Sequence, residues 1–347
     1  MIKVSIITVV LNGAKTIEQT IQSVLEQTYS EIEYIVIDGG STDGTLDIIR
    51  RYSDGIAHWE SAPDRGIYNA MNKGISQCHG EIIGIINSDD WYEHGAVEKM
   101  VGAFNQRNDL GVVFGDLYLI KDGNDNELQI RKLSPFSSLW HDMSVNHPTM
   151  FVKKEVYDIY GLFDERFMIS GDYEIVNRFW SRRVKFGYIN SPMAYYRVNG
   201  MSATQINQRE EENNHIIRNY FEYDIFKEQF LKKVPCDCEN LYVWGTGRGG
   251  EIISGIFEKC GIGVDAYIEN TKDNNKMTYR GRKVIHPADV LPEKTCIIIS
   301  AYSFEEEITK QIIDEIGLTR NSIICFSECF NDYERELEIK NGPCAIL

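Results

Sequence analysis

The sequence predicts an α/β protein with a mostly parallel sheet flanked by helices, followed by a second, smaller α/β domain. Apolar, β-branched runs at residues 4–10, 32–37 and 82–86 are typical of buried strands. Segments with helical apolar spacing separate these runs, and strands that alternate with helices favour a parallel sheet covered on both faces. The alternation begins again at Asn240, after a polar stretch that ends near Pro235, and this predicts the second domain.

The order of elements in the first half follows from the apolar spacing and from the turn residues between elements. Apolar residues at positions 17, 21 and 24 predict a helix over 16–27, and a turn at 12–13 separates it from the opening strand. Further strands are expected at 55–60, 112–120, 128–133, 147–152 and 185–197, and further helices at 45–52, 67–77, 95–105 and from 170 onward. A polar turn at 121–125 should join two of these strands.

The chain is expected to divide into three parts. Residues 1–205 form the predicted first domain, residues 206–238 a helical connector, and residues 239–347 the small α/β domain. The composition becomes polar and helical from Gln205, and Pro235 marks the end of this stretch. Strands of the second domain are expected at 241–244, 263–268, 284–285, 296–300 and 323–326, with a helix up to residue 260 and another over 305–316.

Composition and charge exclude several classes of protein. The 347 residues include 36 Lys and Arg against 52 Asp and Glu, a net charge of −16, which excludes binding of nucleic acid through a broad basic face. No apolar run approaches the ~20 residues that span a bilayer, and the N-terminus has no signal-peptide pattern. The eight cysteines are scattered, and Cys236 and Cys238 are too close for the usual zinc spacing. We therefore expect a cytoplasmic protein with reduced thiols.

Asp89 and Asp90 directly follow a short buried strand, where two adjacent carboxylates lose much of their hydration. A cation, or a ligand that carries one, would offset this cost. The alternative is that one of the two caps the next helix, since Asp is a good N-cap. Asn12, Asp38 and Arg65 also follow predicted strands, and the carboxyl ends of parallel strands form the ligand-binding edge of such a sheet. Polar clusters after four strands favour one shared binding site over four separate caps.

Four motifs of the first domain resemble those of family 2 glycosyltransferases. They are SIITVVLNG at 5–13, IDGGSTDGT at 37–45, PDRGIYNAMNKG at 63–74 and INSDDW at 86–91, in the order and spacing of that family. The resemblance covers residues 1–205 and implies the GT-A fold, a Rossmann-like sheet. It also implies inverting transfer of a sugar from a nucleoside-diphosphate sugar, most often a uridine one, to a hydroxyl of a glycan or lipid-linked acceptor in cell-surface polysaccharide synthesis.

The resemblance assigns the nucleotide to the first strand ends. Asp38 corresponds to the aspartate that accepts the N3–H of uracil, and the backbone around Val10 and Asn12 corresponds to the floor of the nucleotide pocket. Arg65 stands where the family places a cation near the nucleotide, and its planar guanidinium suits a phosphate or a base edge. A salt bridge between Arg65 and Asp64 is the alternative.

The Ser88-Asp89-Asp90 segment resembles the metal-binding motif of the family. By this resemblance Asp90 ligates Mn²⁺ or Mg²⁺ on the diphosphate, and Asp89 holds the ribose or a metal-bound water; hard oxygen ligands suit both cations. Position 88 is Ser where a literal Asp-x-Asp motif has Asp, which leaves open whether His147 supplies a second protein ligand. His147 could instead line the acceptor side, as in a recurrent family segment, or have a structural role.

Inversion requires a base on the face of the sugar opposite the leaving group. Asp172, in ISGDYE at 169–174, resembles the catalytic carboxylate that precedes an aromatic residue in the family. One alternative is that Asp172 caps its helix, and another is that Glu174 is the base. Two residues apart on a helix, these carboxylates point in different directions.

A glycine-rich loop opens the second domain. Gly245, Gly247 and Gly250 form a GxGxxG motif between a predicted strand and helix, and Glu269 follows about twenty residues later, the context in which a helix N-terminus binds a phosphate. At about 110 residues the domain is short for a dinucleotide site. It resembles the small Rossmann-like domains appended to polysaccharide-synthesis enzymes, and we expect a binding or assembly module without redox chemistry.

The expected partners are a nucleotide-sugar donor and a glycan or lipid-linked acceptor, with no nucleic acid. The sequence leaves open whether the protein associates peripherally with the inner face of a membrane or with a second copy of itself. Two rival functions would use a similar fold. A nucleotidyltransferase would need a Gly-rich, Lys-containing signature near the N-terminus, which residues 4–13 lack. A non-catalytic nucleotide-sugar-binding protein would share the pocket but would not need a base at Asp172.

Overall fold

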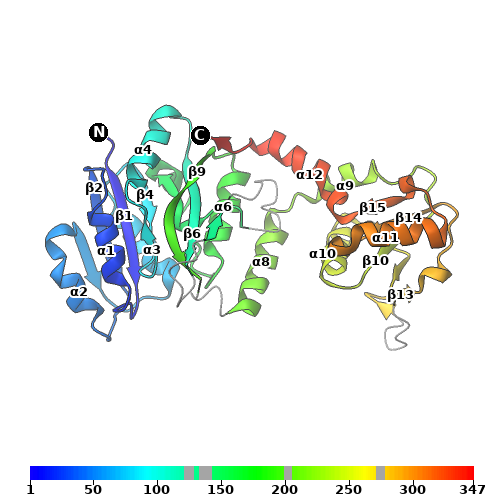
Figure 1. Cartoon of the computed structure of the whole chain (residues 1–347), viewed down its shortest axis with the longest axis horizontal. Helices are drawn as coiled ribbons and strands as arrows, with labels where there is room; N and C mark the ends of the chain where they lie inside the picture. Colours follow the sequence, from blue (N-terminus) through cyan, green and yellow to red (C-terminus); the bar gives the residue numbers. More distant parts are fainter. Residues whose placement is uncertain (121–128, 133–142, 199–204, 271–277) are drawn as a thin grey trace. The chain divides into compact units, whose positions relative to one another are not determined.

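The computed structural model describes the chain apart from residues 121–128, 133–142, 199–204 and 271–277. Contacts divide the chain into two compact units (Figure 1). The first unit contains Met1–Phe221 and Glu338–Leu347, and the second contains Glu222–Leu337. The turn predicted at 121–125 and the start of the strand predicted at 128–133 lie outside the described residues.

The first unit is built on a sheet whose strands follow the order β16-β9-β6-β8-β4-β1-β2-β3. Its parallel core consists of β4 (Ile82–Ile85), β1 (Val4–Val10), β2 (Ile32–Asp38) and β3 (His58–Ser61). Beyond β4 lie the antiparallel β8 (Phe151–Lys153) and then β6 (Val112–Ile120) and β9 (Phe186–Arg197). The short strands β5 (Trp91–Tyr92) and β7 (Gln129–Arg131) pair with β9 and β6. The predicted α/β architecture is confirmed.

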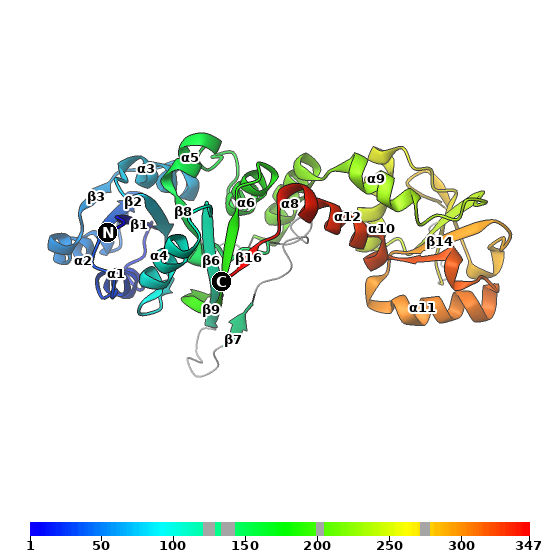
Figure 2. The same ribbon diagram turned by 90° about the horizontal axis from the view of Figure 1, so that it is seen from above.

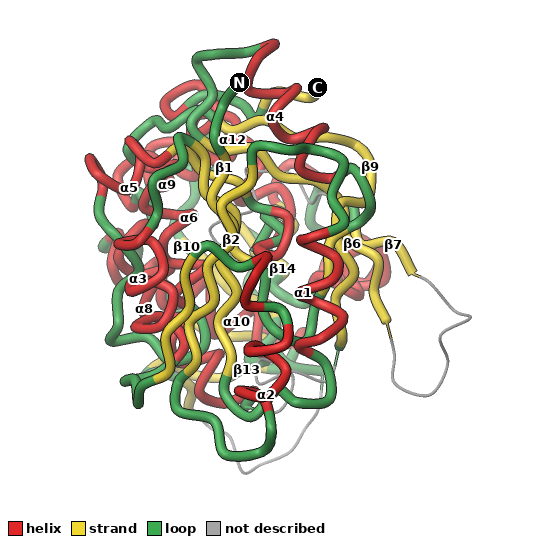
Figure 3. The backbone as a smooth tube through the Cα atoms, turned by 90° about the vertical axis from the view of Figure 1, so that its left-hand side faces the viewer, coloured by secondary structure: helices red, strands yellow, loops and turns green. Residues whose placement is uncertain are grey.

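Helices cover both faces of this sheet. They include α1 (Ile17–Leu25), α2 (Thr45–Arg51), α3 (Ile67–Gln77), α4 (Ala96–Gln106), α5 (Lys154–Tyr160) and α6 (Gly171–Ser181), and α8 (Ile206–Tyr220) packs on α6. Figure 3 shows α3 on one side of β1 and β2 and α1 on the other. Every residue of β1 is buried, because a central parallel strand covered on both faces has no solvated side. Gly74 lets α3 approach closely, since a Cβ there would lie 2.5 Å from Ile7 Cγ2.

A C-terminal strand that was not predicted lies at the edge of the same sheet (Figure 2). β16 (Ala345–Ile346) runs parallel to β9, and Leu347 N donates to Tyr188 O at 2.9 Å. Just before it, Gly342 O accepts a hydrogen bond from Trp180 Nε1 at 3.3 Å. A two-residue strand is too short to show a periodic pattern, so only its pairing partner reveals it.

The second unit is a smaller α/β body with the strand order β12-β13-β11-β10-β14-β15. Its strands are β10 (Asn240–Trp244), β11 (Ala266–Ile268), β12 (Thr278–Tyr279), β13 (Arg282–Ile285), β14 (Thr295–Ile299) and β15 (Ile323–Cys325). Its helices are α9 (Tyr223–Leu231), α10 (Arg248–Cys260), α11 (Glu305–Gln311) and most of α12 (Phe326–Asn341). All pairs except β12 with β13 are parallel, as the alternating pattern predicts.

Three segments differ from the expected elements. The polar segment from Gln205 contains two helices, and α8 belongs to the first unit whereas α9 belongs to the second. The helix expected over 305–316 is α-helical only over α11 and continues as one π-helical turn over Ile312–Ile316. The segment expected as a strand from His147 starts with a 3₁₀ turn, because Pro148 has no N–H for a ladder. Within the described residues, no helix has the length and apolar character to cross a membrane.

Candidate active site

Asp38 ends β2 and is fully buried, with 0% of its surface exposed. Its Oδ2 accepts hydrogen bonds from Gly40 N at 3.0 Å, Ser41 N at 2.9 Å and Ser61 Oγ at 2.6 Å. Its Oδ1 is also buried but has no partner among the described residues. A buried carboxylate oxygen without a donor is costly, and Oδ1 of Asp38 can still accept one hydrogen bond.

The loop after β1 lies against the loop after β2. Asn12 has a left-handed backbone conformation with φ of 54°, and its N–H donates to Ser41 Oγ at 2.7 Å. Asn12 Oδ1 accepts from Thr42 N at 2.9 Å. Val10 O accepts from Gly39 N at 2.8 Å. Val10, the last residue of β1, and Asn12, in the loop after it, are therefore hydrogen-bonded to the loop that follows Asp38.

The two aspartates after β4 differ in exposure. Asp90 is 1% exposed; its Oδ1 accepts from Arg197 N at 3.0 Å, and its Oδ2 is buried with no partner in the described part of the chain. Asp89 is partly exposed, and its carbonyl oxygen accepts from Arg197 Nη1 at 2.5 Å. Helix α4 begins at Ala96 with Gly95 at its N-cap. The alternative in which one of the aspartates caps this helix was therefore wrong.

The electrostatics of this pair suit a divalent cation. Burial raises the pKa of Asp89, and burial followed by the charge of Asp89 raises the pKa of Asp90 well above its usual range. A cation beside the pair would favour both charged forms. Within the described residues, no group of three or more His, Cys, Asp or Glu could hold a metal by itself. The pair fits Mg²⁺ or Mn²⁺ that takes its remaining ligands from substrate phosphates and water.

Arg197 holds the aspartate loop, although it was not among the predicted site residues. Besides its bonds to the two aspartates, it donates from Nη2 to Gln19 Oε1 at 2.7 Å. Its guanidinium lies 4.6 Å from the centre of the Trp91 ring, which stacks on Tyr195. Arg197 and Asp90 are 107 positions apart in the chain, beyond the reach of any local spacing rule.

Asp172 lies in the first turn of α6 and is partly exposed. The buried hydroxyl of Tyr68 donates to Ile169 O at 2.6 Å and lies 3.4 Å from Asp172 N and 3.5 Å from Asp172 Oδ1. Gly171 makes room for the Tyr68 ring, since a Cβ there would lie 2.7 Å from it. Asp172 Oδ1 also accepts from Tyr173 N at 2.8 Å, and no described residue hydrogen-bonds to Oδ2. Tyr68 and Gly171 lie inside quoted motifs but had no predicted role.

Glu174, the alternative base, is buried and paired on both oxygens. Arg178 donates from Nε to Oε1 at 3.1 Å and from Nη2 to Oε2 at 2.8 Å. Tyr220 Oη donates to Oε1 at 2.6 Å. Because donors already occupy both oxygens of Glu174, Asp172 is the better candidate of the two.

His147 lies near Asp172. Its ring is buried and packs edge-on against Phe163, with 5.9 Å between ring centres. Burial lowers the pKa of His147, and the negative charge of Asp172 partly offsets this effect. The candidate base Asp172 is thus close enough to His147 to affect its pKa. The role of His147 as a metal ligand stays a prediction.

Arg65 is 78% exposed at its side chain and pairs with Glu165, with 2.6 Å between Nη2 and Oε2. Asp64, the partner considered from the sequence, accepts from Gly66 N at 2.9 Å instead. The alternative of an Arg65–Asp64 salt bridge was therefore wrong. An exposed ion pair of this kind is weak, so a ligand phosphate can compete for the guanidinium.

The glycine-rich loop of the second unit is bonded internally. Thr246 donates from N and from Oγ1 to Glu269 Oε1, at 2.7 and 2.6 Å. A Cβ at Gly250 would lie 2.2 Å from Gly245 O, and Gly245 has φ of 107°, so both positions require glycine for backbone packing. A Cβ at Gly247 would meet no described atom within 4 Å. The acidic residue expected to face a ligand is bound to the loop itself.

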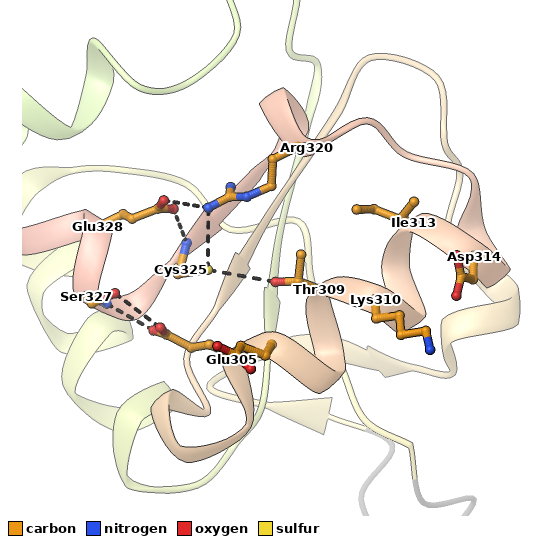
Figure 4. Close-up of a pocket in the computed structure, with 10 residues that line it drawn as sticks. Glu305, Thr309, Lys310, Ile313, Asp314, Arg320, Cys325, Ser327 and Glu328 are labelled. Carbon is orange, nitrogen blue, oxygen red and sulfur yellow. Dashed lines mark hydrogen bonds and ion pairs between the residues drawn. The ribbon is translucent and has the colours of Figure 1, made fainter.

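A hollow of about 500 Å³ in the second unit lies between α11 and the start of α12 (Figure 4). Three of its charged residues have hydrogen-bond partners within the lining. Arg320 Nη2 pairs with Glu328 Oε1 at 2.5 Å, and Glu305 accepts from Ser327 N and Oγ at 3.1 Å each. Among the described residues, the buried carboxylate oxygens that have no partner, Asp38 Oδ1 and Asp90 Oδ2, lie in the first unit.

Comparison with known proteins identifies the first unit. Residues 5–178, half of the chain, match the family described as glycosyl transferase family 2. The chain belongs to glycosyltransferase family 2. The matched segment contains every predicted site residue of the first domain, from Val10 to Asp172. The predicted activity as a glycosyltransferase and the GT-A fold are thereby confirmed.

Curated relatives of this family 2 enzyme are also glycosyltransferases. An uncharacterized glycosyltransferase of Rickettsia typhi is 27% identical over 245 residues, covering 67% of this chain and 72% of the relative. An uncharacterized one of Mycobacterium tuberculosis is 32% identical over 180 residues, covering 50% and 68%. A PGL/p-HBAD biosynthesis glycosyltransferase of Mycobacterium bovis is 25% identical over 183 residues, covering 51% and 69%.

Similar solved structures include a fragment of TarS from S. aureus in complex with UDP-GlcNAc, with a TM-score of 0.49 and 18% identity over 68% of both chains. A mannosyltransferase from Pyrobaculum calidifontis in complex with GDP-Man and Mn²⁺ has a TM-score of 0.47 and 21% identity over 60% of this chain and 61% of that one. Residues 238–324 of the second unit match a separate family described as C2185-like, N-terminal.

Proposed function

We propose that this family 2 glycosyltransferase is an inverting enzyme that uses a UDP-sugar and a divalent metal, with Asp172 as its general base. The observation that carries the proposal is the contrast between the two carboxylates of α6. Glu174 is bound on both oxygens by Arg178, whereas Asp172 is partly exposed and keeps one oxygen without a partner among the described residues. Only Asp172 is available to accept a proton.

The hydrogen bonds of Asp38 support a uracil base. Three donors already occupy Oδ2, so Asp38 can offer a ligand only Oδ1. Uracil presents a single N3–H to a carboxylate, whereas guanine presents N1–H and the amino group side by side and uses both oxygens of its partner. A pocket with one available oxygen favours a uridine nucleotide over a guanosine nucleotide.

Asp89 and Asp90 are the proposed ligands of Mn²⁺ or Mg²⁺. When bound, the ion stabilises the negative charge that develops on the departing diphosphate. Asp89 is the more accessible of the two, and Asp90 contributes the buried, unpartnered Oδ2. Arg197 keeps both carboxylates in one loop conformation through its bonds to Asp89 O and Asp90 Oδ1.

The transfer itself exchanges two bonds at the anomeric carbon. The acceptor hydroxyl oxygen forms a bond to this carbon while the bond to the diphosphate oxygen breaks, and the bonding electrons leave with the diphosphate. Asp172 takes the hydroxyl proton as the new bond forms. Since attack and departure are on opposite faces, the configuration inverts.

The acceptor and the cellular role follow the expectations drawn from the family resemblance. We propose a hydroxyl of a glycan or lipid-linked acceptor in cell-surface polysaccharide synthesis, on the cytoplasmic side of the membrane. The second unit would serve as a binding or assembly module. The rival proposal, a protein that binds nucleotide sugars without turning them over, needs no base and predicts that Asp172 is dispensable.

A donor panel tests the proposed function. The full-length protein is incubated with UDP-glucose, UDP-galactose, UDP-N-acetylglucosamine and GDP-mannose, with and without Mn²⁺, and released nucleoside diphosphate is measured. We expect Mn²⁺-dependent release of UDP from one of the uridine donors. Release from none of them by folded protein contradicts the proposal, and preferential release of GDP contradicts the assignment of the base pocket.

A further inference from the structure

We propose that Glu212 is a positioning residue for Asp172, a role that rests on the proposed function of Asp172 as the base. Glu212 lies on α8, beyond residue 178 where the match to glycosyltransferase family 2 ends. The inference concerns a part of this chain that the family match does not include. It assigns α8, which the sequence suggested was a connector, to the catalytic machinery of the first unit.

The carboxylate of Glu212 binds three successive backbone N–H groups just before α6. Oε1 accepts from Met168 N at 2.9 Å, and Oε2 accepts from Ile169 N at 3.0 Å and from Ser170 N at 2.8 Å. Bonds to a charged acceptor are stronger than bonds between neutral groups. Ser170 stands at the N-cap of α6 and makes no side-chain capping bond. Glu212 therefore supplies, from another helix, the negative charge that a helix start favours.

Tyr68 holds the same segment from its carbonyl side. Its hydroxyl donates to Ile169 O and lies against both the N–H and Oδ1 of Asp172. Burial raises the pKa of Tyr68 well above its usual range, and the charges of Asp172 and Glu212 both add to this effect. The backbone that leads into Asp172 is thus bonded on one side to Glu212 and on the other to Tyr68, which leaves the base one defined position.

Helix α8 is itself fixed against α6. Near its end, Tyr220 Oη donates to Glu174 Oε1 at 2.6 Å, and within it Gln208 Nε2 donates to Glu212 Oε1 at 3.2 Å. A glutamine at position 212 would have the same shape but only one acceptor oxygen, and its amino group would face backbone donors. The segment would relax and displace Asp172, and a displacement of about 1 Å can cost about 10²-fold in rate.

The test uses UDP release from the donor that the panel identifies, in the full-length protein with Mn²⁺. For E212Q we expect kcat to fall by about 10–10²-fold. UDP affinity should stay within about threefold, because the proposed base-binding residue Asp38 lies on β2 and is not held by Glu212. E211Q is the matched control: Glu211 is the exposed neighbour on the same helix, and its variant should keep wild-type kcat. In E212A, added acetate should restore part of kcat, because it can occupy the three N–H groups.

Three results would overturn the proposal: wild-type kcat in E212Q, a loss that follows UDP affinity instead of kcat, or an equal loss in E211Q. If E212Q does not fold, E212D replaces it in the test. This variant keeps the negative charge and should retain a higher kcat than E212A. An equal loss of kcat in E212D and E212A contradicts the proposal. Failure of the proposed function gives other results. In that case D172N keeps wild-type turnover, or the wild-type protein releases no nucleotide.

Discussion

Strand β2 carries two buried carboxylates that differ in their hydrogen bonding. Glu33, near its start, is 8% exposed, and Asp38, at its end, is 0% exposed. Glu33 is bound on both oxygens, by Lys3 Nζ at 2.9 Å on Oε1 and by Ser5 Oγ at 2.6 Å and His79 N at 2.8 Å on Oε2. Asp38 keeps one buried oxygen without a partner in the described part of the chain. The carboxylate near the start of the strand is thus fully hydrogen-bonded, whereas the one at its end has an acceptor oxygen left over for a proposed ligand.

The second unit shows that a sequence motif alone is weaker evidence for a ligand site than a buried polar atom without a hydrogen-bond partner. Its GxGxxG loop follows a strand and opens a helix, yet Glu269 is bonded to Thr246 of the loop. Among the described residues, the buried carboxylate oxygens without a partner are Asp38 Oδ1 and Asp90 Oδ2, and both are in the first unit. The hydrogen bonds therefore make the first unit the better place to look for a ligand than the glycine-rich loop.

The largest effect is expected for D172N. An amide cannot take the acceptor proton, so turnover should fall by about 10³-fold. UDP affinity should stay unchanged, because Asp172 lies in α6 and not in the loops beside Asp38. Steady-state UDP release and calorimetric titration with UDP measure the two quantities. Wild-type turnover in this variant would contradict the proposal that Asp172, and not the paired Glu174, is the general base.

D38N tests the unpartnered oxygen directly. Asn either loses the acceptor at Oδ1 or turns its amino group toward the N3–H of uracil, so UDP should bind about 10–10²-fold more weakly, as for loss of a hydrogen bond to a charged group. E33Q is the control on the same strand and should keep wild-type UDP affinity. Equal UDP affinity in D38N and wild type would show that the unpartnered oxygen does not bind the base.

D89N and D90N separate the two carboxylates of the metal loop. The variant that loses a direct ligand should need about tenfold more Mn²⁺ for half-maximal UDP release. Burial raises the pKa of both groups, so folding disfavours the charged form of each carboxylate. Without Mn²⁺, each variant should therefore have a higher Tm than wild type. A lower Tm in both would mean that the pair stabilises the fold, as Glu33 does.

Glu33 should make stability depend on pH. Burial alone would raise its pKa, but bonds from Ser5, His79 N, Lys3 and the His79 ring together lower the pKa from 4.5 to about 2. Because the folded-state pKa is lowered, the stabilisation is fully present above about pH 4.5 and is lost as pH falls toward 2. Denaturant unfolding should show a steeper loss of stability over this range in wild type than in E33Q. Parallel curves would contradict a stabilising role for Glu33.

The smallest effect on activity is expected for E269Q in the second unit. The variant weakens the bonds to Thr246 and should cost about 1–2 kcal/mol of unfolding free energy in that unit. UDP release should remain within twofold of wild type, since the donor site lies in the first unit. A large loss of turnover with unchanged UDP affinity would instead give the glycine loop a part in the reaction.

Much of the first unit was predictable because its signals are local. Buried runs such as residues 4–10 followed by a turn predict strands, and the polar residues that follow each strand must share one edge of a parallel sheet. This reasoning selected Asp38 and the Asp89–Asp90 pair as candidate site residues, and the family resemblance added Asp172. The weaker predictions concerned the segment from Gln205, because helix propensity does not say which unit a helix packs against.

The sequence alone was enough to infer the order of the motifs, the type of fold and the identity of the candidate carboxylates. The tertiary structure alone decided which of their oxygens are available. Arg197 reaches Asp90 from 107 positions away, Glu212 reaches the backbone before Asp172 from another helix, and β16 joins β9 from the end of the chain. Hydrogen-bond partners are set by contacts between distant segments, and sequence spacing describes only neighbours along the chain.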